Sequence, residues 1–188
     1  MNKSILFLFI VLGLSGTSNA QSGVAVGVGL SLGQTHYDLV NRSAGFLTGW
    51  HASISGRLWP GLYYFRPGIE LHRISLVTIP QLDPFTNIPS VYLIKVPLQG
   101  GVRLVNIEHF ELRTQIGLVG TYAMLIEDND FGLNYDTIED YQLGALFGLG
   151  IDIGPITLDV SREISLTQFY HDQDDFLHYW LISAGLFF

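Results

Sequence analysis

The sequence of 188 residues contains no cysteine, which excludes a disulfide framework and any thiolate metal site. Basic residues are also scarce: nine Lys and Arg stand against 17 Asp and Glu, for a formal net charge of −8. This acidity argues against nucleic acid as a partner, because nucleic-acid binding depends on Lys and Arg contacts to phosphates. After Leu14 the chain also lacks an apolar run long enough for a transmembrane helix, although 48% of its residues are hydrophobic. Apolar content that is spread out rather than gathered into blocks is typical of a membrane β-barrel.

The first 20 residues have the features of a secretory signal peptide. Lys3 supplies the positive charge, residues 5–14 form the apolar stretch, and Ser18-Asn19-Ala20 provides a cleavage site before Gln21. The stretch is too short to cross a bilayer as a helix, which needs about 20 apolar residues. We therefore expect a signal peptide at 1–20 and a single domain at 21–188.

The end of the chain has a strict alternation of residue types. Trp180, Ile182 and Leu186 belong to an unbroken apolar row, and the last residue is Phe188. Alternation with period two is typical of a β-strand, because successive side chains point to opposite faces of the sheet and here one of the faces is continuously apolar. The segment resembles the closing strand of bacterial outer-membrane β-barrels, which the barrel assembly machinery reads. The resemblance implies that these four residues are an assembly signal.

Seven further segments show the same alternation. The connections between the segments are alternately long and short along the chain. The long loops are residues 35–48, 75–90, 126–140 and 167–177, and the short turns are residues 59–62, 105–109 and 153–155. The order predicts an all-β fold: an eight-stranded antiparallel transmembrane β-barrel with short periplasmic turns, long external loops and both termini periplasmic. The predicted strands lie within 24–33, 50–58, 63–72, 92–103, 110–124, 141–152, 156–163 and 178–188.

The polar row of these strands carries five cations and five carboxylates. A soluble barrel has the same period, but it would turn its polar row outward; the balance of charge instead favours pairing inside a narrow lumen. Eight strands leave room for little besides side chains, so we expect a charge network that plugs the lumen; the alternative is a small ion pathway. Its residues are Arg57, Arg66, Glu70, Lys95, Arg103, Glu111, Arg113, Asp152, Asp159 and Glu163.

Arg162 departs from the pattern because it falls on the apolar row, where a charge is costly near the middle of a bilayer. Either it lies near the outer interface, or a β-bulge turns it inward. Pro97 is a second irregularity, since proline inside a strand removes a ladder donor. We expect it to mark a local break in pairing.

Residues 92–98 (YLIKVPL) resemble the Y-L-E-I-P-L strand of the PorT-like outer-membrane β-barrel family of Bacteroidetes, which belongs to the porin family. Lys95 stands where that family often has an acid. Residues 65–71 (FRPGIEL) resemble the preceding strand of the family. The resemblance implies a location in the outer membrane of a Gram-negative bacterium and, for some relatives, a role in secretion or gliding machinery.

Two predicted external loops are rich in potential metal ligands. In residues 127–140, Asp128, Asp130, Asp136 and Glu139 could bind a hard cation such as Ca²⁺, although solvated acid, loosely bridged to lipopolysaccharide by divalent ions, is the favoured interpretation. The last loop could bind zinc or provide an acid–base pair, but a polar loop tip is favoured there. Its residues are His171, Asp172, Asp174, Asp175 and His178.

Catalysis is a further alternative, because some eight-stranded barrels are enzymes. No spacing in the chain forms a recognisable triad, so we expect no enzymatic activity and no cofactor. The candidate nucleophiles are Ser43, Ser75, Ser90 and Thr167, with His36, His51, His72 and His171 as bases. The favoured function is a structural or interaction role, and the alternatives are a secretion or gliding component, a lipid-modifying enzyme and a small pore. The expected partners are outer-membrane lipid, lipopolysaccharide, the barrel assembly machinery and a periplasmic or outer-membrane protein.

Overall fold

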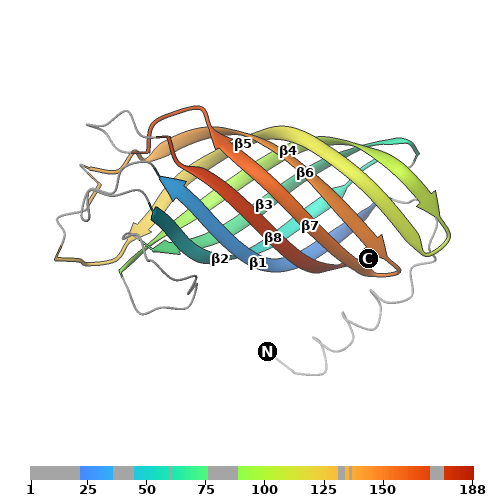
Figure 1. Ribbon diagram of the computed structural model, residues 1–188, viewed down its shortest axis with the longest axis horizontal. Coiled ribbons are helices and arrows are strands. Elements are labelled where there is room, and N and C mark those ends of the chain that lie inside the picture. The colour runs from blue at the N-terminus through green and yellow to red at the C-terminus, as the bar shows by residue number, and fades with distance from the viewer. Residues whose placement is uncertain are drawn as a thin grey trace, which may run out of the picture.

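Eight β-strands close into a barrel in the computed structural model, which describes residues 22–35, 45–59, 61–75, 89–130, 134–135, 137–169 and 176–188. Each strand pairs antiparallel with its neighbours in sequence, and β8 pairs with β1 to close the sheet (Figure 1). This confirms the predicted fold class. The described residues include no helix of the length and apolarity needed to cross a membrane. The strands are β1 (Gly23–Thr35), β2 (Gly45–Arg57), β3 (Tyr63–Ser75), β4 (Ser90–Ile107), β5 (Phe110–Ile126), β6 (Tyr141–Ile153), β7 (Ile156–Ser165) and β8 (His178–Phe187).

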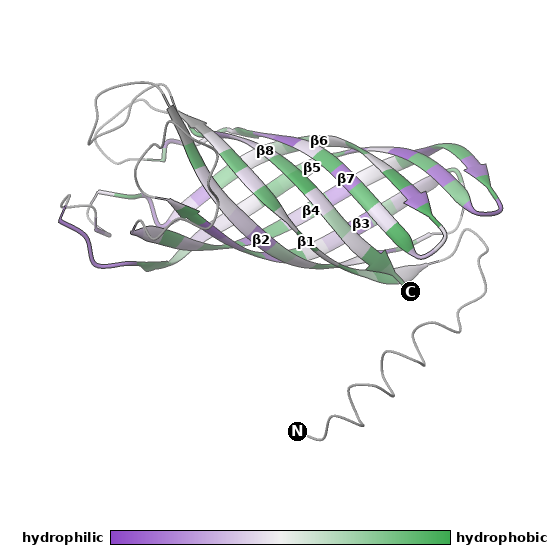
Figure 2. Cartoon of the chain, turned by 60° about the horizontal axis from the view of Figure 1, so that its bottom comes forward, coloured by the Kyte–Doolittle hydropathy of each residue, from purple (hydrophilic) through white to green (hydrophobic). Residues whose placement is uncertain are grey.

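The outer surface of the barrel is apolar and its interior carries the charges. Val28 is 65% exposed and Ile116 is 71% exposed, whereas Lys95 and Arg113 are fully buried. Hydrophobic bands alternate with polar ones along the strands (Figure 2). A soluble barrel would have the reverse arrangement. The outer surface is therefore suited to lipid, because exposure of so large an apolar area to water would be unfavourable.

The two ends of the barrel differ in how the strands are connected. At the turn end, short connections join β2 to β3, β4 to β5 and β6 to β7, and the C-terminus lies at this end (Figure 1). At the opposite end, which we call the loop end, the connections are longer. Phe188 exchanges two backbone hydrogen bonds with Val24, at 2.8 and 3.0 Å. The last residue of the chain is thus part of the seam that closes the barrel.

Several strand ends differ from the predicted ones. β4 continues to Ile107, so residues 105–107 belong to a strand and only Glu108 and His109 form the turn. Register shifts in the β4–β5 ladder between Tyr92 and Leu93 and between Arg103 and Val105 interrupt the simple alternation. β2 begins at Gly45, inside the predicted loop 35–48. Period-two patterns locate the middle of a strand well, but a bulge or a glycine hides its end.

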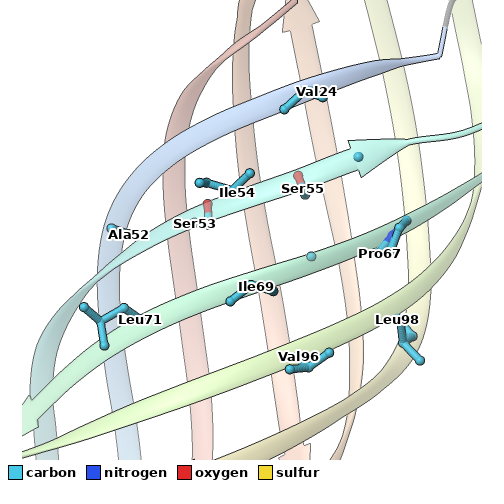
Figure 3. A pocket seen from close by; sticks show the side chains of 12 residues that line it. Val24, Ala52, Ser53, Ile54, Ser55, Pro67, Ile69, Leu71, Val96 and Leu98 are labelled. Carbon is cyan, nitrogen blue, oxygen red and sulfur yellow. The ribbon is translucent and has the colours of Figure 1, made fainter.

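Two prolines weaken the wall formed by β2, β3 and β4. The β3–β4 ladder stops at Pro67–Leu98 and resumes at Glu70–Lys95, so the predicted break at Pro97 is present. Proline cannot donate to the ladder. The outer surface is hollowed here into a groove of about 720 Å³, lined mainly by apolar side chains that include Ile54, Ile69 and Val96 (Figure 3).

Candidate functional site in the barrel lumen

All ten predicted lumen charges lie on the inward-facing rows of their strands; nine of them take part in ion pairs, and the Glu70 carboxylate is hydrogen-bonded to His72. Alternation places them there, because residues two apart in a strand share a face. They come from six of the eight strands, β2 to β7. The strands thus bring charges that are far apart in sequence into one interior.

Arg113 is at the centre of the charges at the turn end. Its Nη1 lies 2.6 Å from Oδ1 of Asp159, and its Nη2 lies 3.0 Å from Oδ1 of Asp152. Nη2 also donates a hydrogen bond of 2.6 Å to the hydroxyl of Thr157. Gly150 faces the guanidinium, and a Cβ atom at that position would collide with it. The glycine on this inward row therefore makes the space that the arginine occupies.

Two more arginines complete this layer. Arg57 contacts both Asp152, at 2.5 Å, and Glu111, at 3.3 Å, and its guanidinium lies 4.3 Å from the centre of the Phe187 ring. Arg103 Nε lies 3.0 Å from Glu111 Oε2. Its Nη1 donates to backbone carbonyls of the turn between β2 and β3, including that of Gly61. The network thus extends from the ion pairs to the turn that joins two strands.

Lys95 and Glu163 form a separate pair nearer the loop end. The Lys95 Nζ atom lies 2.7 and 2.8 Å from the two carboxylate oxygens of Glu163. The same ammonium lies 3.9 Å from the centre of the Tyr179 ring. A buried cation without such contacts would be very costly, so these partners account for a lysine that is fully buried.

A chain of hydrogen bonds crosses the wall formed by β8, β1, β2 and β3. Ser183 Oγ lies 2.8 Å from His51 Nε2, and Ser31 Oγ lies 3.0 Å from His51 Nδ1 and 3.1 Å from His72 Nδ1. His72 Nε2 lies 2.8 Å from the carboxylate of Glu70. The two imidazole rings stack with their centres 4.8 Å apart. With both imidazoles neutral, each group can donate to the next one along the chain. Ser183 then donates to His51, His51 donates to Ser31, Ser31 donates to His72, and His72 donates to Glu70.

Part of this chain has the carboxylate, imidazole and hydroxyl order of a serine hydrolase triad. Ser31, however, is fully buried and its hydroxyl is already bonded to both histidines. An acyl substrate needs space next to the nucleophile and donors for the oxyanion. A small cavity of about 10 Å³ beside Arg66 and Asp159 has room for about one water and not for an acyl substrate. The geometry therefore favours a structural role for Ser31.

An apolar cluster fills the lumen at the loop end, and the sequence analysis did not predict it. Leu93, Leu146 and Leu181 point inward from three strands. Two loop residues, Ile138 and Phe169, are buried against them, and the backbone N–H of Glu139 donates to the carbonyl of Phe169 at 3.0 Å. The signal was the presence of leucine on rows that are otherwise polar. The full cluster is Leu47, Ile74, Val91, Leu93, Ala123, Ile138, Leu146, Phe169, Leu177, Tyr179 and Leu181.

The predicted loop ligands are not brought together in the described residues. Asp128, Asp130 and Glu139 are described, but no group of three or more His, Cys, Asp or Glu within the described ranges could hold a metal ion. Glu127 instead accepts a hydrogen bond of 2.8 Å from the backbone N–H of Ser90. Outside the described residues lie Asp136, His171, Asp172, Asp174 and Asp175.

The remaining catalytic candidates have structural contacts. The Ser75 hydroxyl accepts from the backbone N–H of Thr48 at 3.1 Å, and the Thr167 hydroxyl accepts from that of Leu143 at 3.0 Å. Ser43, His36 and His171 lie outside the described residues.

Arg162 stays on the outward-facing row of β7. The pairing of β7 with β6 and with β8 runs without a register shift, so no bulge turns this side chain inward. Its guanidinium lies 5.0 Å from the centre of the Trp180 ring.

Comparison with known proteins identifies the architecture. No protein-family model and no curated protein matches the chain. Among solved structures, the outer membrane protein OprG from Pseudomonas aeruginosa matches with a TM-score of 0.51 at 9% identity, covering 92% of this chain and 98% of that one. The chain has the fold of an outer-membrane β-barrel. The resemblance to the PorT-like family gains no support from these comparisons and stays a prediction.

Two other solved barrels match less closely. Neisserial surface protein A (NspA) has a TM-score of 0.49 at 11% identity, and Ail of Yersinia pestis, in complex with the heparin analogue sucrose octasulfate, has 0.46 at 11%. Each match covers 89% of this chain and 99% of the other.

Proposed function

We propose that the mature chain is a non-enzymatic outer-membrane β-barrel with a structural or interaction role, whose lumen is closed to ions. In this arrangement the signal peptide directs export, the turn end faces the periplasm and the loop end faces outward. Lipopolysaccharide and the barrel assembly machinery are its proposed partners, and a contact with another protein would use the loop end.

The observation that carries this proposal is the filling of the lumen by two different layers. At the turn end four arginines, Arg57, Arg66, Arg103 and Arg113, are ion-paired with three carboxylates, and Lys95 is paired with Glu163 nearer the loop end. At the loop end the apolar cluster replaces polar contacts. An ion entering from the loop end would lose its hydration without meeting an oxygen ligand, and selectivity filters depend on such ligands.

Location is tested by cell fractionation of the full-length chain and of a variant lacking Phe188. We expect the full-length protein in the outer-membrane fraction, and a several-fold smaller amount there without Phe188. The deletion removes the two backbone bonds to Val24 and the terminal aromatic group. Ala184→Val, a small change on the same outward row, should leave the amount unchanged. Recovery of the full-length protein in the soluble periplasmic or inner-membrane fraction would contradict the proposed location.

Conduction is tested by adding the purified, refolded protein to a planar lipid bilayer. We expect no steady channels, because buried ion pairs occupy the turn end of the described lumen and the apolar cluster occupies its loop end. A folded fraction must be verified by the shift in electrophoretic mobility between unheated and heated samples. Reproducible conductance steps from that folded fraction would favour the small-pore alternative.

A further inference from the structure

Arg162 is exceptional among the basic side chains of the described residues. Seven Arg and Lys side chains lie in the described ranges, and six of them form ion pairs with carboxylates: Arg57, Arg66, Arg73, Lys95, Arg103 and Arg113. Arg162 has no carboxylate within 4.0 Å and no hydrogen-bond partner among these residues, and its Nη1 atom is buried without one. Its positive charge is therefore uncompensated by the described protein.

The position of Arg162 makes this more costly. It lies on the lipid-facing row of β7, paired across the sheet with Phe147 on β6 and Trp180 on β8. An arginine on the lipid-facing surface of a barrel costs free energy that increases with depth in the bilayer. A guanidinium that stays charged on this surface, with no carboxylate from the protein, is stabilised by an anion from the lipid side.

The counter-charge must come from the leaflet at the loop end. Arg162 lies three residues before Ser165, the last residue of β7, and Trp180 is the third residue of β8. At about 3.3 Å per residue and a tilt of about 40°, Arg162 is roughly 8 Å below the loop end of β7. Tryptophan is enriched in the aromatic girdle at the depth of the lipid headgroups, so Trp180 beside Arg162 favours that depth for both side chains.

The chemistry of the pair selects the anion. The guanidinium carbon of Arg162 lies over the Trp180 ring, 5.0 Å from its centre, in a cation–π contact. The guanidinium N–H groups are not used by the described protein, and a guanidinium fork matches the spacing of phosphate oxygens. Arg73 is in a similar position, on the outward side of β3 near the loop end, but the protein supplies its counter-charge. Its Nη2 lies 3.9 Å from the carboxylate of Glu127. At Arg162 the protein provides the aromatic surface but no carboxylate.

We propose that Arg162 and Trp180 form a binding site for a phosphate group of the outer-leaflet glycolipid, the sugar-linked phosphate of lipopolysaccharide. The site rests on the proposed function, since the loop end faces the outer leaflet only in an outer-membrane protein with that orientation. Phosphate on the sugar headgroup lies at the depth of Arg162, and the acyl chains continue along the apolar row towards Val160 and Leu158.

The test uses the complete mature barrel in phosphatidylcholine nanodiscs that also contain lipid A, dephosphorylated lipid A or phosphatidylglycerol. The amount of each lipid retained is measured by native mass spectrometry after exchange into detergent. We expect phosphorylated lipid A to be retained about tenfold better than the dephosphorylated form, as a charge-assisted contact implies. Arg162→Met should abolish this preference, and Arg162→Lys should keep part of it. Ile164→Met, on the same outward row, is the matched control and should behave as the wild type.

Each other result would overturn the site. Equal retention of lipid A by the wild type and by Arg162→Met would show that the phosphate binds elsewhere. Retention of phosphatidylglycerol as strong as that of lipid A would overturn the assignment to a glycolipid. If Arg162→Met fails to fold, Arg162→Gln provides the same comparison. The nanodisc supplies the lipid wherever the cell places the protein, so failure of this test and failure of the fractionation test are separate results.

Discussion

Replacing Arg113 by methionine should lower the free energy of unfolding by about 3–5 kcal/mol, because it leaves buried carboxylates without their main partner. Asp159 would keep the ion pair with Arg66, at 3.1 Å, and a hydrogen bond of 3.4 Å from Gln115, and Asp152 would keep the ion pair with Arg57. Both carboxylates are buried in the lumen, away from compensating water. Urea titration of the barrel in lipid vesicles, followed by tryptophan fluorescence, measures the loss.

A second variant separates loss of the ion pair from loss of packing. Adding Asp152→Asn to Arg113→Met neutralises a carboxylate that has lost one of its partners, while Arg57 keeps Glu111 at 3.3 Å, and should recover part of the stability. If Arg113→Met alone unfolds within about 1 kcal/mol of the wild type, the value typical of exposed pairs, the turn-end charges are hydrated rather than packed. The proposed ionic layer would then be wrong.

Alternation along the chain was sufficient to predict the strands and which residues face inward. Arg57 and Asp152 both fall on polar rows, so their burial could be inferred from the sequence. Their contact at 2.5 Å could not, because 95 residues separate them and their relative height depends on how far each strand is displaced along its neighbour. Sequence period gives the face of a strand but not the stagger of the barrel.

The chain of hydrogen bonds through the two histidines illustrates the same limit. His51 and His72 were considered as catalytic bases, but their partners Ser31 and Ser183 lie on β1 and β8. The two strands meet only when the barrel closes. Residue types alone could not indicate that one serine hydroxyl would lie between two stacked imidazoles, and that position makes the histidines part of the packed wall.

The apolar cluster was missed for a different reason. Leu93 and Leu181 fall on the inward rows by alternation, but only the charges of those rows entered the prediction of the lumen. Ile138 and Phe169 lie within the predicted external loops 126–140 and 167–177, whose sequence is otherwise rich in acidic residues. Local composition describes the exposed part of a loop, whereas a single buried side chain can fix its position.

Phe169→Ala should therefore have a large effect for a residue outside the strands. The side chain is 1% exposed and lies in the cluster that closes the loop end. Removal of a buried phenyl group costs about 3–5 kcal/mol. The connection between β5 and β6 is also affected, because Glu139 bonds to the backbone of Phe169. We expect lower stability in urea and faster cleavage of these connections by protease, since their docking is what limits local opening.

Phe176→Ala is the matched control, because Phe176 lies in the same connection between β7 and β8 but is 39% exposed. It should change the free energy of unfolding by less than about 1 kcal/mol, as most exposed substitutions do. Limited proteolysis of both variants in lipid vesicles shows whether the buried Phe169 side chain, and not any phenylalanine in this connection, holds the loops against the apolar cluster. Equal cleavage rates in Phe169→Ala and Phe176→Ala would mean that the loop end is held by its strands alone. In that case the apolar cluster would fill the lumen without fastening the loops above it.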